Sequence, residues 1–557
     1  MKLFHPMADR VSGGRSGSRF LSGVSVLTLS AVLVKVIGLL YRIPMLTRLG
    51  SEGMGYFNTA YEVYALLCVL STAGLPVAMS VLISEVTATG KDGCLHTAPT
   101  VRRIFSVSLG VFLAVGSLGS GAMFLLAEPL GKLLGNPEAA ACIRAISPTV
   151  FLICLSGAFR GYFQGQRNMV PTAVSQVIEA MGKLFLGLLF AGYAKSKGAD
   201  LPTTAAYAVL GLTVGTALSV LYLTLHKRWA ERKGKPRAEA VLLTDREIPG
   251  RRVVLRRLLW TAVPVTVSAG VISLTKCVDL ALILRRVQDA GLTAREANAL
   301  YGCYSTLAVP VFNILPSLTT SVAMSAVPAL SAALSRMRAA GESGERENAR
   351  REVGRTASSA LGLTLCLSVP AGLGLCVFAG DILGLLFSGQ PAAVALAIPW
   401  LRVLGLSVPA ACLITVTGAM LQASGHAGCP VVAMLVGTGV KTVLAYFLLG
   451  IPSLGLLGAP ISSLVCDTLI LAVNAMFLAR CAPDMLPGMK QGLAGLLLPL
   501  GLSVAAHLPV LAIARRYSPD IAAPVATLLR IAGVVVLYGA GLCAVLYIMK
   551  RKKPKEV

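Results

Sequence analysis

The sequence predicts an all-α polytopic membrane protein of about 14 transmembrane helices, arranged as two parallel six-helix lobes followed by two C-terminal helices. Hydrophobic residues make up 55% of the 557 residues and charged residues only 13%, whereas soluble globular proteins carry about 25% charged residues. Apolar runs of about 20 residues, the length of a membrane-spanning helix, recur along the whole chain. Short motifs also recur at a nearly constant offset between the two halves.

Fourteen apolar runs are long enough to cross a bilayer, and they lie at residues 20–41, 56–84, 104–127, 140–159, 171–194, 204–226, 258–284, 299–334, 356–380, 393–423, 429–450, 458–479, 491–514 and 525–549. If the N-terminus is inside, the inside connections hold about three times as many Lys and Arg residues as the outside connections. Arg160 and Arg167 count among these inside residues. We therefore expect a multi-pass protein of the cytoplasmic membrane with both termini in the cytoplasm.

The second run is interrupted by Ala73-Gly74-Leu75-Pro76. Proline lacks an amide donor, so this stretch predicts a kink within the membrane. A membrane tolerates such a break only where neighbouring helices or a water-filled cavity satisfy the freed carbonyl groups. We therefore expect this part of the chain to lie against other helices or a cavity.

The longest connection, Lys227 to Arg257, follows the sixth run and is rich in basic residues. We interpret it as a solvated cytoplasmic linker near anionic lipid headgroups. The predicted organisation is an N-lobe with spans 1 to 6, the basic linker, a C-lobe with spans 7 to 12, and a last part with spans 13 and 14 and a basic tail, at residues 1–226, 227–257, 258–480 and 481–557.

Two lobes that both begin inside must be parallel repeats, and weak internal similarity agrees with this. Asn136-Pro137 corresponds to Gln390-Pro391, and Lys183 corresponds to Lys441 at nearly the same offset. Each of the two lysines follows a proline that opens its span by about a dozen residues. The agreement of these pairs indicates a duplication.

Charged residues inside the apolar runs are candidates for function, because a charge at the bilayer centre costs about 2.5–3.5 kcal/mol on insertion scales. Those in the predicted spans are Lys35, Glu62, Glu179, Lys183, Lys276, Asp279, Arg402, Lys441, Asp467 and Arg530. Helical spacing would allow Glu179 to pair with Lys183, and Lys276 with Asp279, and this purely structural alternative stays open. Lys35, Arg402 and Lys441 have no acid within a helical turn.

Cations from both lobes would give a central cavity a positive potential that suits an anionic group such as a phosphate. The candidate substrate-binding residues are Lys35, Arg42, Arg48, Lys183, Lys276, Arg285, Arg286 and Lys441. For the arginines at the span ends, anchoring at the membrane interface is the alternative. The acids Glu62, Glu179 and Asp279 are candidates for coupling to a proton or metal ion, since a change of partner could bias the two lobes.

Motifs of soluble enzymes are not apparent in the sequence. No HExxH, GxSxG or dinucleotide-binding loop occurs, and Gly437 to Thr442 only superficially resembles a phosphate-binding loop. The 13 cysteines form no CxxC pair and no zinc-like spacing with histidine. We therefore expect a protein that is not an enzyme and has no cofactor and no bound metal. We also expect no nucleic-acid partner, because the net charge of +25 resides mainly in connections that orient the chain in the membrane.

Residues 35–38 (KVIG), 41–44 (YRIP), 53–56 (GMGY) and 71–76 (STAGLP) closely resemble the stage V sporulation protein B and polysaccharide exporter family. This family belongs to the superfamily of multidrug, oligosaccharidyl-lipid and polysaccharide (MOP) exporters, which includes lipid II flippases and drug antiporters of the MATE type. The chain departs from the lipid II flippase pattern at Leu67-Cys68, where that pattern has paired arginines.

The resemblance implies a two-lobed bundle that works by alternating access and moves a lipid-linked anionic glycan precursor across the membrane. Fourteen spans are typical of the lipid-handling branch, in which the last two helices help to form a groove for the lipid tail. Its implied partners are the lipid-linked glycan, membrane lipids and a coupling cation or proton, and we expect a functional monomer.

A cation-coupled multidrug antiporter is the alternative from the same superfamily. Its expected acidic binding residues are scarce in this sequence. A membrane scaffold or a glycan polymerase is a further alternative. A polymerase would need a large outside loop, and no predicted outside connection exceeds about twenty residues.

Overall fold

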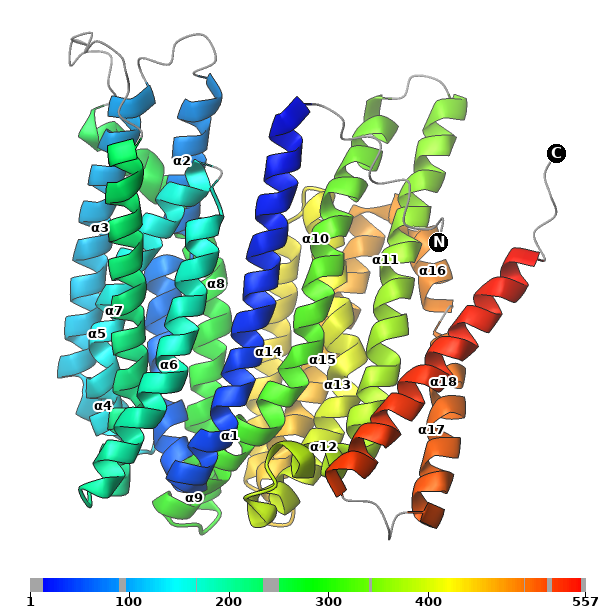
Figure 1. Cartoon of the computed structure of the whole chain (residues 1–557). Coiled ribbons are helices and arrows are strands. Elements are labelled where there is room, and N and C mark those ends of the chain that lie inside the picture. The colour runs from blue at the N-terminus through cyan, green and yellow to red at the C-terminus, as the bar shows by residue number, and fades with distance from the viewer. Residues whose placement is uncertain are drawn as a thin grey trace. The chain divides into compact units, whose positions relative to one another are not determined.

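The computed structural model describes residues 14–89, 97–166, 168–233, 250–339, 343–494, 496–517 and 523–551. This described part of the chain consists of helices and short connections, without a strand. It divides into two compact units, Met1–Ala281 and Leu282–Val557. The long helices within each unit run side by side (Figure 1).

Unit 1 is built from long helices with one short helix and one 3-10 turn. Its elements are α1 (Gly14–Thr72), α2 (Leu75–Thr89), α3 (Thr97–Leu125), α4 (Ala127–Leu133), η2 (Pro137–Ala139), α5 (Ala140–Gly165), α6 (Val170–Ser196), α7 (Leu201–Lys233) and most of α8 (Arg251–Asp289).

Unit 2 begins in the last turns of α8 and has a similar succession of long and short helices. Its further elements are α9 (Ala294–Cys303), η3 (Tyr304–Ala308), α10 (Val309–Ala339), α11 (Ser343–Val377), α12 (Ala379–Leu386), α13 (Pro391–Ala423), α14 (Gly428–Leu449), η4 (Gly455–Leu457), α15 (Gly458–Cys481), η5 (Pro483–Met485), α16 (Leu486–Ala494), α17 (Leu497–Tyr517) and α18 (Ala523–Arg551).

The helices confirm the predicted polytopic membrane fold. Among the described residues, 12 helical segments are long and apolar enough to cross a bilayer. One of them, Ser30–Val86, joins the first two predicted spans, and the predicted span at 491–514 corresponds to the shorter apolar helix Leu497–Ala512. Each of the fourteen predicted runs therefore corresponds to a helical segment among the described residues.

The connection between the first two spans differs from the prediction. The sequence ends the first span at Tyr41, yet α1 continues through Pro44 and bends only at Gly50, whose φ of 66° lies in the left-handed region that glycine adopts without steric cost. The predicted break at residues 73–76 is confirmed, because α1 ends at Thr72 and α2 begins at Leu75.

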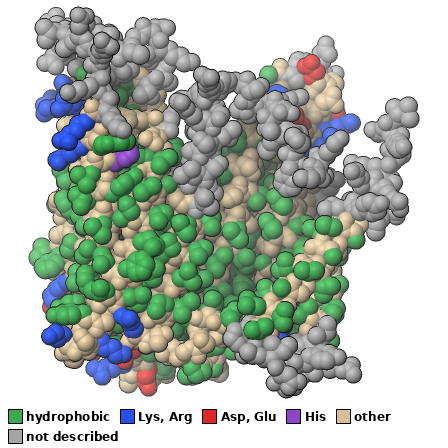
Figure 2. All heavy atoms as spheres, viewed as in Figure 1, with side chains coloured by type: hydrophobic (Ala, Val, Ile, Leu, Met, Phe, Trp, Pro, Cys, Tyr) green, Lys and Arg blue, Asp and Glu red, His purple; other side chains and the backbone are tan. Residues whose placement is uncertain are grey.

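The surface of unit 1 has the pattern of a lipid-facing bundle. Leu118, Phe185 and Leu189 expose 74%, 61% and 60% of their surface. Figure 2 shows hydrophobic side chains over the middle of this unit, with Lys and Arg gathered near its two ends. Lipid tails are as apolar as leucine, so helices in a membrane associate through close packing rather than through the hydrophobic effect. The outward leucines are therefore expected in a protein that spans the bilayer.

The two units repeat the same order of helix contacts, as the predicted duplication requires. In unit 1, α3 packs against α5, and α7 packs against both α5 and α6; in unit 2, α11 packs against α13, and α15 packs against both α13 and α14. The backbone repeats as well, because Asn136 (φ −137°, ψ 71°) and Gln390 (φ −138°, ψ 64°) each precede a proline that begins a helical turn.

The predicted linker lies largely outside the described residues. Residues 227–233 are the last turns of α7, and residues 234–249 are not among those described. The first turns of α8 contribute Val254, Leu258 and Ala262 to an apolar cluster with α2, α3 and α5 of unit 1. The lobe boundary at residues 227–257 and the cytoplasmic location of this segment remain predictions.

Candidate substrate cavity in unit 1

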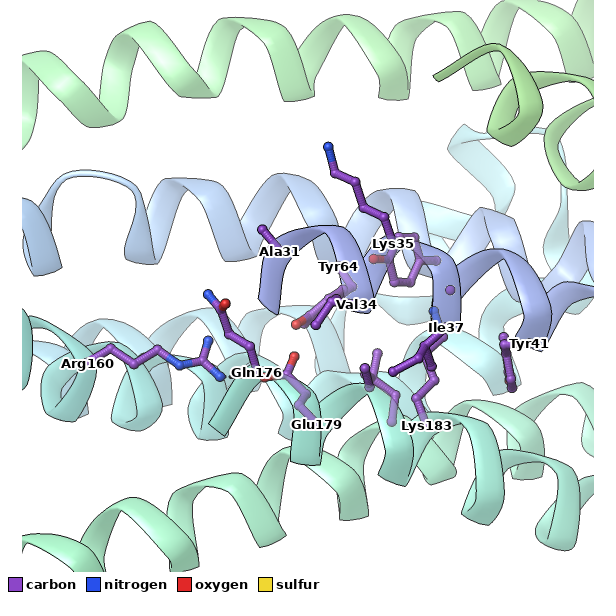
Figure 3. A pocket seen from close by; sticks show the side chains of 14 residues that line it. Ala31, Val34, Lys35, Ile37, Tyr41, Tyr64, Arg160, Gln176, Glu179 and Lys183 are labelled. Atoms are coloured by element: carbon purple, nitrogen blue, oxygen red, sulfur yellow. Dashed lines mark hydrogen bonds and ion pairs between the residues drawn. The ribbon is translucent and has the colours of Figure 1, made fainter. Parts of the chain in front are cut away.

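A cavity of about 460 Å³ lies among α1, α5, α6 and α7. Figure 3 shows that basic, acidic and aromatic side chains meet at its wall. The lining residues are Ala31, Val34, Lys35, Ile37, Gly38, Tyr41, Tyr61, Tyr64, Arg160, Gln176, Glu179, Ala180, Lys183 and Leu212. Two predicted substrate-binding residues, Lys35 and Lys183, and one predicted coupling residue, Glu179, therefore line the same cavity.

Arg160 was expected in an inside connection, and the structure corrects this. Helix α5 continues to Gly165, because the apolar sequence extends past Arg160 through Tyr162 and Phe163. The glycine that follows Arg160 allows close contact with α2: a Cβ at Gly161 would lie 2.9 Å from the Pro76 carbonyl oxygen. Arg160 is thereby held inside the bundle. The continuing apolar run was the sequence signal that could have revealed it.

Glu179 forms its ion pair with Arg160 rather than with Lys183. A guanidinium nitrogen of Arg160 lies 2.9 Å from a carboxylate oxygen of Glu179, and the two side chains expose only 14% and 19% of their surface. Arg160 also donates a hydrogen bond of 3.0 Å to the Ser175 hydroxyl. The i,i+4 pairing that the sequence allowed is therefore replaced by a contact between α5 and α6.

The Lys183 ammonium is surrounded by aromatic rings. Its Nζ lies 5.1 Å from the ring centre of Tyr41, 5.5 Å from that of Phe57 and 4.5 Å from that of Tyr61. Each ring belongs to α1, on one side or the other of the bend at Gly50. An ammonium above aromatic faces gains about 0.5–2 kcal/mol per favourable contact. These three rings, which we call the aromatic cage, stabilise the charge without neutralising it.

Close packing between α6 and α7 fixes the positions of Glu179 and Lys183. A Cβ at Gly182 would lie 2.4 Å from the Gly215 Cα, and a Cβ at Gly215 would lie 3.0 Å from the Glu179 carbonyl oxygen and 3.0 Å from the Lys183 amide nitrogen. Only glycine allows the two backbones to approach this closely, as small residues do between membrane helices.

Lys35 lies on the first part of α1, where its side chain is exposed. Figure 3 shows the side chain extending away from Glu179 and Arg160. The cavity therefore presents the cations Lys35, Arg160 and Lys183 against one acid, Glu179. A guanidinium and ammonium groups at a partly apolar wall suit a phosphate-bearing ligand.

A second charged group of unit 1 contains the other predicted coupling residues. Glu62 lies within electrostatic range of Lys276, Arg42 and Asp279. The Cys277 thiol also contacts the Glu62 carbonyl oxygen at 3.4 Å, which places this part of α8 beside α1. Arg42 is within electrostatic range of both Glu62 and the Lys183 of the cavity.

Arg48 lies away from the cavity. Its guanidinium donates a hydrogen bond to the Leu188 carbonyl oxygen of α6, and a Cβ at Gly192 would lie 2.7 Å from one of its nitrogens. Lys195 in turn donates a 3.2 Å hydrogen bond to the Arg48 carbonyl oxygen. These contacts join α1 to the last turns of α6.

Three predicted cations belong to unit 2. Arg286 forms an ion pair of 3.0 Å with Asp289, donates a 3.1 Å hydrogen bond to the Tyr446 carbonyl oxygen and lies 4.1 Å from the centre of the Tyr446 ring. Arg285 is exposed. Lys441 lies within electrostatic range of Asp467, so this lysine of the repeat has an acidic neighbour on α15.

Within the described part of the chain, no group of three or more His, Cys, Asp and Glu residues is placed to hold a metal ion.

Comparison with known sequences gives two family matches. The family described as polysaccharide biosynthesis protein matches residues 20–334, which is more than half of the chain, and the MatE family matches residues 298–447. Stage V sporulation protein B of Bacillus subtilis (strain 168) is 26% identical over 471 residues, covering 83% of this chain and 84% of that protein. The lipid II flippase MurJ of the same organism is 24% identical over 444 residues, covering 77% of each chain.

Solved structures share the fold. Lipid II flippase MurJ in an inward closed conformation matches with a TM-score of 0.67 and 14% identity, over 94% of this chain and 99% of that one. A multidrug resistance MATE family transporter of the MOP superfamily, in an inward-facing conformation, matches with a TM-score of 0.55 and 18% identity, over 83% of this chain and 98% of that one.

Proposed function

Because this chain belongs to the polysaccharide biosynthesis protein family, we propose that it is a flippase that moves a lipid-linked anionic glycan precursor across the cytoplasmic membrane. The relative named as a lipid II flippase favours this class of substrate. The substrate class is a polyprenyl diphosphate that carries sugars. No bond is made or broken in this reaction, so the protein acts as a transporter.

The observation that carries the proposal is the net positive charge of the cavity wall. The cavity wall carries three cations, Lys35, Arg160 and Lys183, and one acid, Glu179, and is otherwise mostly apolar or aromatic. In such surroundings an electrostatic attraction is stronger than in water, so the excess of positive charge favours a diphosphate over a neutral or cationic ligand. The diphosphate and sugars would occupy the cavity while the polyprenyl tail stays in the lipid.

The remaining predicted roles extend this proposal. Arg42 is proposed to contribute to the same positive potential, since it lies within electrostatic range of Lys183. Coupling to a cation or proton would use Glu62 and Asp279, which lie near Lys276, and Glu179 beside the cavity. The substrate-binding roles of Arg48, Lys276, Arg285, Arg286 and Lys441 remain predictions. We also propose a monomer with both termini in the cytoplasm.

A cation-coupled multidrug antiporter is the competing function, and the MATE family neighbours share its fold. The excess of cations in the cavity of unit 1 disfavours it, because a cationic drug requires acidic or aromatic partners that are not already occupied. In this cavity Glu179 is paired with Arg160, and the lining rings of Tyr41 and Tyr61 already contact Lys183.

Purified protein in liposomes that contain a labelled polyprenyl-diphosphate-linked glycan tests the proposal. Lys35→Ala should slow movement of this lipid by about ten-fold or more, because removing one charged partner costs about 1.5–3 kcal/mol. Lys35→Arg should retain part of the rate. Lys132→Ala, which removes an exposed lysine of α4 outside the cavity, is the matched control and should keep the parental rate.

Two outcomes would contradict the proposal. The first is an unchanged rate for the diphosphate lipid in Lys35→Ala. The second is a selective loss of cationic dye efflux in that variant, which would favour the antiporter.

A further inference from the structure

Two cations of the cavity could form an ion pair with Glu179. Lys183 follows it by one helical turn, which is the favourable order for an acid and a lysine on a helix. The carboxylate instead binds Arg160 of α5 at 2.9 Å, in a contact where both side chains are mostly buried. Arg160 also donates hydrogen bonds to the Ser175 and Ser219 hydroxyls, at 3.0 and 3.4 Å. The guanidinium is therefore bound by the carboxylate and by two hydroxyl groups.

The aromatic cage explains why Lys183 does not take part in this ion pair. Its Nζ lies within 5.5 Å of three ring centres, and the nearest is Tyr61 at 4.5 Å. The rings direct the ammonium toward α1 and stabilise it as a cation. The two cations of the cavity wall thus differ in their partners: Arg160 is paired with a carboxylate, whereas Lys183 lies against three aromatic rings.

We propose that Glu179 is the resident counter-anion of the cavity, which the diphosphate of the substrate displaces from Arg160, while the aromatic cage holds Lys183 apart from this ion pair as a second cation for the ligand. The inference rests on the proposed function and assigns Glu179 and the cage to substrate selection.

The exchange would select ligands by charge. A ligand must compensate Arg160 at least as well as the carboxylate does, and two phosphate groups offer more charge and more acceptor oxygens than one carboxylate. A ligand with a single charge, or a neutral lipid, gains little from the replacement. The empty cavity meanwhile avoids the cost of a partly buried, uncompensated guanidinium.

Binding of inorganic pyrophosphate to the full-length protein in lipid nanodiscs, measured by titration calorimetry, tests this inference. Glu179→Gln should bind pyrophosphate about ten-fold more tightly than the parent, a difference of about 1.4 kcal/mol, because Arg160 no longer has a competing anion. Glu128→Gln is the matched control. It removes an acid from another ion pair of the same unit, with Arg144 at 2.6 Å, outside the cavity, and should leave the affinity unchanged.

Glu179→Asp separates the position of the carboxylate from its charge. Aspartate is shorter by one carbon–carbon bond of about 1.5 Å, so its carboxylate is drawn back from Arg160 while the net charge stays the same. Pyrophosphate affinity should again rise, by about three-fold. This variant also carries the test if Glu179→Gln does not fold, as judged by size-exclusion chromatography and thermal unfolding.

Lys183→Met tests the role of Lys183 as the second cation. It should weaken pyrophosphate binding by about ten-fold in the parent and by the same factor in Glu179→Gln, because a charge that takes no part in the exchange contributes additively. An effect that differs strongly between the two backgrounds, or no effect, would refute the role of the cage.

The outcomes distinguish this inference from the proposed function. If the parent binds pyrophosphate and Glu179→Gln and Glu179→Asp bind it equally or less tightly, the counter-anion is refuted while the cationic cavity stands. If neither the parent nor any variant binds pyrophosphate, and the parent does not move the diphosphate lipid, the proposed function is refuted together with the inference.

Discussion

The contact between α6 and α7 offers a sharp test of how the cavity is built. Gly182 precedes Lys183 directly, and a Cβ at this position would lie 2.4 Å from the Gly215 Cα. Carbon atoms in contact are normally about 3.5–4.0 Å apart, so Gly182→Ala would bring a methyl group more than about 1 Å too close to a backbone atom. A backbone cannot rotate away as a side chain can. The two helices must therefore separate.

The expected cost follows from this overlap. Inserting a methyl group into a well-packed interface typically costs about 1–3 kcal/mol. The intrinsic preference of a helix for alanine over glycine, up to about 1 kcal/mol, offsets part of it. We expect Gly182→Ala to lower the thermal stability of the protein by a few degrees. We also expect it to weaken pyrophosphate binding, since Lys183 moves with its helix.

Gly110→Ala is the matched control, because a Cβ at Gly110 of α3 would meet no atom within 4 Å. This variant should keep or slightly raise the thermal stability. The assay is thermal unfolding in detergent followed by tryptophan fluorescence, with pyrophosphate titration of the folded protein. If Gly182→Ala is as stable as Gly110→Ala and binds pyrophosphate normally, the close α6–α7 contact does not position the cavity.

Three further predictions concern charge and topology. Arg160→Gln should slow movement of the diphosphate lipid by about ten-fold or more in liposomes, because it removes a cation and leaves an acid facing the substrate; a parental rate would exclude Arg160 from the site. Arg530→Ala should loosen α18 from α12, because Arg530 and Asp381 form an ion pair of 2.8 Å between these helices. Limited proteolysis should then cleave the variant near the C-terminus faster than the parent, and equal cleavage rates would show that apolar packing alone holds α18. Single cysteines placed at residues 227–257 and 336–355 should react with a membrane-permeant thiol reagent and not with an impermeant reagent applied outside. Labelling by the impermeant reagent would contradict the predicted orientation.

The sequence by itself determined the membrane class, the helical runs, the break before Pro76 and the internal repeat. These features depend on local chemistry. A run of apolar residues must form a helix in lipid to satisfy its backbone, and a proline interrupts that helix wherever it folds. The repeat was detectable because Asn136-Pro137 and Gln390-Pro391 form the same turn. Asn136 and Gln390, the residues before the two prolines, have nearly the same backbone angles.

The partners of the intramembrane charges were decided only by the tertiary structure. Spacing along one helix favoured Lys183 for Glu179, but Arg160 of the neighbouring helix α5 takes this place. An ion pair between helices depends on which faces meet, and one sequence does not show this. The aromatic cage around Lys183 likewise forms only because α1 bends at Gly50 and returns its rings to one ammonium group.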